Sequence, residues 1–83
     1  MADNFRIKFR FDGKEYSSGV CDVYRDKTMY QVFLPVELRA TNVMGPQFIL
    51  IYRIEGEYTA QLTTALSTTL FNAFVDYIDK QPL

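Results

Sequence analysis

The chain begins with a strict alternation of apolar and basic side chains. The apolar members are Phe5, Ile7, Phe9 and Phe11, and the basic members are Arg6, Lys8 and Arg10. Because successive side chains of a strand point to opposite faces of a sheet, this pattern predicts a strand with one apolar face and one cationic face. The Asp12-Gly13 dipeptide that follows is typical of a tight hairpin turn.

Two further strands are expected after this turn. The second runs from about Tyr16 to Arg25, and the third runs from Met29 to Val36, where larger apolar side chains again recur at every second position. A loop made of only Asp26 and Lys27 would pair Val23 with Tyr30 and Cys21 with Val32.

The register of the first hairpin decides which residues of the second strand face the core. A bulged turn of three residues over Asp12–Lys14 would bring Cys21 and Val23 to the same face as Phe5, Ile7 and Phe9. We favour this register because it gives all three strands a single core face.

A connection and a fourth strand are predicted next. Residues 37–46 carry no clean period and end in Gly45-Pro46, which is typical of a longer loop. Gln47–Ile54 is predicted as a strand, and its segment Phe48–Tyr52 is apolar at every position. A strand of this kind is normally covered on both faces.

The period becomes helical after Glu55-Gly56-Glu57. A helix is expected from about Tyr58 to Asp79, with Glu57 or Thr59 at its start. Its main apolar stripe contains Tyr58, Leu62, Leu66, Leu70, Ala73 and Tyr77. The predicted fold is therefore a single α+β domain over residues 1–83, in which a four-stranded antiparallel β-meander is followed by one long C-terminal α-helix packed on one face.

The predicted helix carries a second apolar seam, spaced at i, i+3, i+4 and i+7. Its members are Phe71, Phe74, Val75 and Ile78. A single helix on a sheet buries one side, so the second seam predicts an interface with another copy of the chain. The alternative is that the 37–46 loop or the N-terminal residues cover Phe71 and Val75.

The sheet face away from the helix is expected to combine cations with aromatic rings. In the favoured register it gathers Arg6, Lys8, Arg10, Tyr16, Tyr24, Met29 and Phe33. Basic side chains that follow phosphates beside rings that stack on bases are typical of proteins that bind single-stranded nucleic acid. The isoelectric point of about 5.2 argues against this alternative, and charges on an exposed sheet face also serve solubility.

Composition excludes several kinds of chemistry. The 83 residues contain no histidine and one cysteine. Without histidine, a serine or cysteine nucleophile activated by histidine cannot form. With one cysteine, a zinc site built from several thiolates cannot form within one chain. Cys21 is expected to be a buried apolar residue, and an unpaired cysteine suits a reducing compartment. We expect no enzyme activity, no cofactor and no metal.

Membrane attachment is not expected either, because the sequence turns charged directly after Met1-Ala2 and its longest apolar run is five residues, Phe48–Tyr52. The net charge of −1 is too small to keep copies of the chain apart. We therefore expect a cytoplasmic binding or interaction module that forms a homodimer through the C-terminal helix and the fourth strand. Single-stranded nucleic-acid binding is the alternative function.

Overall fold

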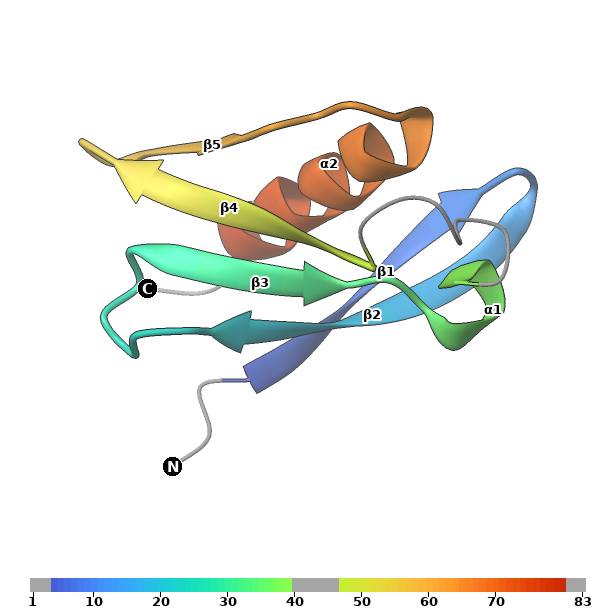
Figure 1. Ribbon diagram of the computed structural model, residues 1–83, viewed down its shortest axis with the longest axis horizontal. Coiled ribbons are helices and arrows are strands. Elements are labelled where there is room, and N and C mark those ends of the chain that lie inside the picture. The colour runs from blue at the N-terminus through green and yellow to red at the C-terminus, as the bar shows by residue number, and fades with distance from the viewer. Residues whose placement is uncertain (1–3, 40–46, 81–83) are drawn as a thin grey trace.

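A single antiparallel sheet of five strands, in the order β1-β2-β3-β4-β5, forms the framework of the computed structural model, and a helix lies across one of its faces (Figure 1). The structure describes residues 4–39 and 47–80. The elements are β1 (Asn4–Phe11), β2 (Lys14–Asp22), β3 (Met29–Phe33), α1 (Val36–Arg39), β4 (Phe48–Ile54), β5 (Glu57–Ala60) and α2 (Ala65–Asp79). The α+β class is confirmed, with five strands where four were predicted.

The first hairpin has a tight turn without a bulge. Asp12 and Gly13 both have positive φ, 53° and 79°, which is the backbone of a type I′ turn. Phe11 therefore lies opposite Lys14, and Phe9 lies opposite Tyr16. The predicted three-residue bulge is wrong, because the Asp-Gly pair by itself satisfies the twist between the two strands.

This register exchanges the two faces of β2 relative to the prediction. Val20, which lies opposite Phe5, enters the core together with Ser18. Cys21 therefore points to the face opposite the helix and is half-buried there. Its predicted inward orientation is wrong because a shift of one residue reverses every side chain of a strand.

The loop between β2 and β3 is longer than the predicted two residues. The ladder joins Asp22 to Tyr30, and the Val23 amide donates to the Met29 carbonyl oxygen at 3.0 Å. Asp22 Oδ1 accepts a hydrogen bond from the Lys27 amide at 3.2 Å, which ties the loop to the end of β2. The predicted pairs of Val23 with Tyr30 and of Cys21 with Val32 are therefore each displaced by one residue.

The region between β3 and β4 begins with a short helix. β3 ends at Phe33, and the Pro35 carbonyl accepts the Leu38 amide at 3.0 Å at the start of α1. Leu38 turns into the core. Part of the predicted 37–46 loop is thus helical, and its remainder, residues 40–46, lies outside the described residues.

A second tight hairpin accounts for the extra strand. Glu55 and Gly56 have φ values of 53° and 83°, so the chain reverses and β5 pairs with β4 from Ile54↔Glu57 to Ile51↔Ala60. Tyr58 thus belongs to β5, and α2 begins at Ala65 with Thr64 as its N-cap. The Thr64 side chain accepts from the Ser67 amide at 3.0 Å, and the Ser67 hydroxyl accepts from the Thr64 amide at 3.0 Å. This capping box fixes the helix start, several residues after the predicted start.

The core lies between the sheet and α2. Its buried apolar members are Ile7, Phe9, Val20, Tyr30, Val32, Leu34, Leu38, Ile51, Leu70 and Phe74. Phe74 is completely buried and lies among three other rings, with centroid distances of 4.8 Å to Tyr30, 5.2 Å to Tyr58 and 6.3 Å to Phe5. This aromatic cluster joins the helix to β1, β3 and β5.

The two apolar seams of α2 form one broad face. At about 100° per residue the predicted stripe and the second seam are centred roughly 120° apart, and the fully buried Leu70 and Phe74 lie between the two centres. The remaining seam members, Phe71, Val75 and Ile78, are half-buried and pack against the core. The second seam is therefore partly covered: Phe74 is fully buried, and Phe71, Val75 and Ile78 keep some exposed surface beside the sheet face that α2 crosses (Figure 1).

Candidate interaction surface

The sheet face opposite α2 carries large apolar side chains on the neighbouring strands β3 and β4. We call this group the outer patch. It consists of Met29 and Phe33 from β3 and Phe48, Leu50, Tyr52 and Ile54 from β4. Met29 lies opposite Tyr52, and the Phe33 and Phe48 rings lie 6.4 Å apart. The patch is a consequence of strand alternation, because the even-numbered residues of β4 point away from Ile49 and Ile51 on the core side.

The outer patch is accessible to solvent. Phe48 is 38% exposed, Tyr52 is 41% exposed and Ile54 is 60% exposed, and the other three members are half-buried. The expectation that this apolar strand is covered on both faces is wrong for the described residues. Contiguous exposed apolar patches are uncommon on monomeric proteins and often mark interaction sites.

Basic side chains follow β1 beside this patch. Arg6, Lys8 and Arg10 are all exposed on the face opposite the helix, as predicted. Arg6 Nη2 donates to Ser17 Oγ at 3.0 Å, and a Cβ on Gly19 would lie 3.7 Å from Arg6 Nη1. The Arg6 side chain thus extends across β2, and it lines a shallow hollow together with Gly19 and Phe33.

The aromatic part of the predicted nucleic-acid face is only partly assembled. Phe33 lies on the outer face, and Tyr24 is exposed in the loop after β2. Tyr16 is on the opposite side, where its ring stacks on Phe9 at 5.7 Å. Its predicted position on the basic face is wrong because the first hairpin lacks the bulge.

Two carboxylates lie at the far corner of the same face. Glu57 is on β5 opposite Ile54, and Glu55 is in the preceding turn. Strands lie about 4.8 Å apart and rise about 3.3 Å per residue, so roughly 20 Å across the sheet and 20 Å or more along it separate these carboxylates from Arg6, Lys8 and Arg10. The outer patch lies between the basic strand and the acidic turn.

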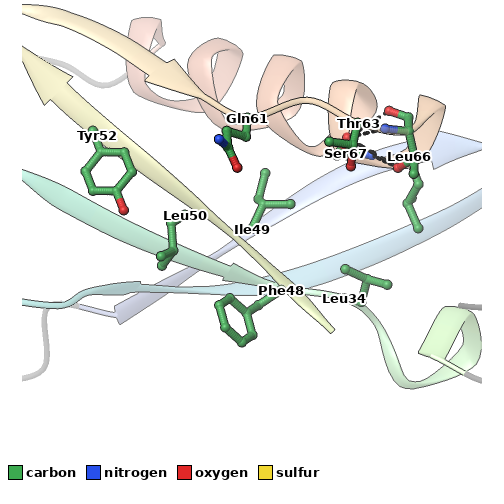
Figure 2. A pocket seen from close by; sticks show the side chains of 10 residues that line it. Leu34, Phe48, Ile49, Leu50, Tyr52, Gln61, Thr63, Leu66 and Ser67 are labelled. Carbon is green, nitrogen blue, oxygen red and sulfur yellow. Dashed lines mark hydrogen bonds between the residues drawn. The ribbon is translucent and has the colours of Figure 1, made fainter. Parts of the chain in front are cut away.

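A cavity of about 540 Å³ opens beside β4. Pairing with β5 starts only at Ile51. On the side of β4 away from β3, the segment from Phe48 to Leu50 therefore has no strand beside it within the described residues. Figure 2 shows Phe48, Leu50 and Tyr52 on one side of β4, Ile49 and Leu34 near its start, and Gln61, Thr63, Leu66 and Ser67 across the gap. The cavity is therefore continuous with the outer patch at Phe48 and Leu50.

The polar groups of this cavity are largely engaged with one another. Thr64 and Ser67 are held in the capping box, and the Ser67 hydroxyl donates to the Thr64 carbonyl at 2.8 Å. A small-molecule site normally adds a few polar groups aimed at its ligand. This cavity is better suited to apolar side chains of a partner.

Two side chains near the sheet, Tyr30 and Asp26, have shifted pKa values. Burial raises the pKa of Tyr30 to about 12, and the nearby Tyr58 and Asp22 raise it further, whereas Arg53 opposes the shift. Tyr30 is therefore a neutral phenol at physiological pH. In the loop after β2, hydrogen bonds from the Thr28 hydroxyl and amide lower the pKa of Asp26 below its usual value. Both shifts are therefore explained by burial, nearby side chains and hydrogen bonds within the fold.

Neither a metal-binding cluster nor a membrane-spanning helix is found in the part of the chain that the structure describes. Residues 4–39 and 47–80 contain no group of three or more cysteine, aspartate or glutamate side chains arranged to hold a metal ion. Over the same ranges, none of the helices has both the length and the apolar character needed to cross a lipid bilayer.

The sequence predicted the basic strand, the outer position of Met29 and Phe33 and a role of the fourth strand in the interface, but not the exposure of the outer face of β4. The signal was present, because Phe48–Tyr52 is apolar at every position. This pattern predicts a strand buried on both faces, whereas only the core face of β4 is covered.

Comparison of the chain with protein-family models, with curated proteins and with solved structures gives no significant match.

Proposed function

We propose that this protein is a small, non-catalytic interaction module that self-associates through the outer patch. The observation that carries the proposal is the exposed apolar surface of β3 and β4, with Phe48, Tyr52 and Ile54 exposed on one face of β4. Burying these side chains between two copies would remove them from water, at about 25 cal/mol for each Å² buried. In this proposal the fourth strand carries the interface, and the helix stabilises the protomer.

Two features of the chain support a binding role over catalysis. The sequence has no histidine, which is the commonest general base, and the most strongly shifted pKa in the described residues belongs to a phenol within the aromatic cluster. The unpaired Cys21, half-buried on the outer face, suits the reducing conditions of the cytoplasm, which is where we place the protein.

Sedimentation equilibrium of the whole chain tests the proposal directly. At tens of micromolar we expect a mass approaching twice the 9.7 kDa of one chain, with dissociation on dilution, because an interface at the small end of the usual size range supports a moderate affinity. A single species of one chain mass at all concentrations up to several hundred micromolar would contradict self-association.

Single-stranded nucleic-acid binding is a second candidate, because Arg6, Lys8 and Arg10 lie on the same face as Phe33 and Arg6 extends toward that ring. A fluorescent oligothymidine titrated at low ionic strength should then bind with an affinity that falls with salt, with a logarithmic slope of about −2 for three phosphate contacts. Arg10→Glu should weaken binding about tenfold, and Lys80→Glu at the end of α2 is the matched control. Undetectable or salt-insensitive binding would remove this candidate.

A further inference from the structure

We infer that the partner of the outer patch is a second copy of this chain, placed face to face so that the basic strand of one copy lies over the acidic turn of the other. This inference rests on the proposed self-association and adds the orientation of the two copies. It follows from three properties of the outer face: the size of the patch, the positions of its charges and the symmetry of a dimer.

The outer patch is too small to form a stable interface by itself. It spans two strands over about seven residues, which corresponds to on the order of 200 Å² in projection at the usual strand spacing and rise. A standard interface buries about 800 Å² on each partner. A dimer through this face must therefore include the neighbouring parts of the sheet, and these are the charged corners.

The two charged corners have opposite sign and lie on opposite sides of the patch. Arg6, Lys8 and Arg10 follow β1 at one edge of the sheet, and Glu15 on β2 lies opposite Arg10 on the same face, so three cations outnumber one carboxylate at this corner. Glu55 and Glu57 lie at the β4–β5 turn, at the other edge and at the other end of the strands. The line that joins the two corners thus crosses the sheet diagonally and passes over the patch.

A two-fold axis through the patch exchanges these corners. When the axis lies in the plane between two facing sheets and is perpendicular to that diagonal, each basic strand lies over the partner's acidic turn, and the two patches lie over each other. The contact is isologous, so every charge pair occurs twice. In this arrangement the strands of the two sheets cross at a large angle, which is one of the two common ways in which sheets pack.

Other orientations are disfavoured by charge. An axis parallel to that diagonal would place Lys8 of each copy near Lys8 of the other, and like charges at an interface act against association. Electrostatic complementarity therefore selects one orientation from those that the apolar patch alone would allow. Because the pairs lie at the rim, they set orientation and contribute modestly to affinity.

A charge exchange between Lys8 and Glu57 tests the orientation. The full-length chain is compared with the Lys8→Glu, Glu57→Lys and Lys8→Glu/Glu57→Lys variants by sedimentation equilibrium at low salt. We expect each single reversal to raise the dimer dissociation constant about tenfold, because it removes two attractive pairs and creates two repulsive ones. The double variant should return to within about threefold of the original chain. Asp79→Lys, an exposed position on α2, is the control and should leave the constant unchanged.

The double variant separates a direct pair from a general effect of charge, since Arg25 and Lys27 in the β2–β3 loop also contribute to the field at that end of the sheet. Single reversals that weaken the dimer without recovery in the double variant would overturn the orientation, as would a dimer insensitive to all three variants, and in both cases self-association would stand. An original chain that remains monomeric would overturn both proposals. Circular dichroism of each variant confirms that the fold is retained.

Discussion

Replacing Phe74 with alanine should lower the free energy of unfolding by about 3–5 kcal/mol, which is the usual cost of removing a completely buried phenylalanine side chain. The ring is fully buried and contacts Tyr30, Tyr58 and Phe5 from three different strands. Within residues 4–39 and 47–80, α2 is the element that brings a ring into this cluster, so alanine at this position would leave a cavity. Small domains are stable by only about 5–15 kcal/mol, so the variant should be close to unfolding at 37 °C.

Urea denaturation followed by circular dichroism measures this effect, and Phe48→Ala is the matched control. Phe48 is the same residue type at a position that is 38% exposed, and its removal should cost the protomer less than about 1 kcal/mol. The Phe74→Ala loss should be the same at every protein concentration. A loss that grows at high concentration would instead indicate that Phe74 lies in an interface between copies, as the sequence pattern predicts.

Replacing Ile54 with lysine should raise the dimer dissociation constant at least 100-fold. Ile54 is 60% exposed, so the protomer tolerates a charged side chain there with little change in the free energy of unfolding. In the proposed dimer the same position is buried in both copies, and there the new ammonium group would compete with the partner's basic strand for Glu57, which lies opposite position 54. The two-fold symmetry doubles the effect.

The matched control is Val36→Lys. Val36 is 73% exposed on α1, which lies at the end of the sheet away from the β4–β5 turn (Figure 1). Both variants replace an exposed β-branched residue with lysine, and sedimentation should show dissociation for Ile54→Lys alone. Equal dissociation constants for the two variants would mean that the outer patch is not the interface.

Local pattern was sufficient to predict much of the protein. The alternation from Phe5 to Phe11 identified β1 and both of its faces, and the apolar segment before Ile54 identified β4. The two tight hairpin turns, Asp12-Gly13 and Glu55-Gly56, both have positive φ. The prediction of strands succeeded at the first turn and failed at the second. The pattern predicts a turn at Asp12-Gly13, whereas at Glu55-Gly56 it predicts a break before a helix, because the four residues of β5 are too short a segment to be distinguished from a helix start.

Register and coverage could not be obtained from the sequence. A bulge in the first hairpin would have changed few local preferences, but it reverses the faces of Tyr16, Val20 and Cys21. Only the pairing of β1 with β2 decides this. The same holds for α2, whose two seams are separate stripes on a helical projection, while in the structure the fully buried Leu70 and Phe74 lie between them and their other members are half-buried.

The sequence by itself determined that this chain forms an antiparallel meander with a C-terminal helix, that β1 has a basic outer face, and that it carries more apolar side chains than a two-layer core requires. Tertiary structure decided where the excess lies. Leu70 and Phe74 of α2 are fully buried against their own sheet, and Phe71, Val75 and Ile78 are half-buried, whereas Phe48, Tyr52 and Ile54 remain on the surface. The physical reason is that periodicity specifies which side chains share a face, whereas the packing of one element on another specifies which faces are covered.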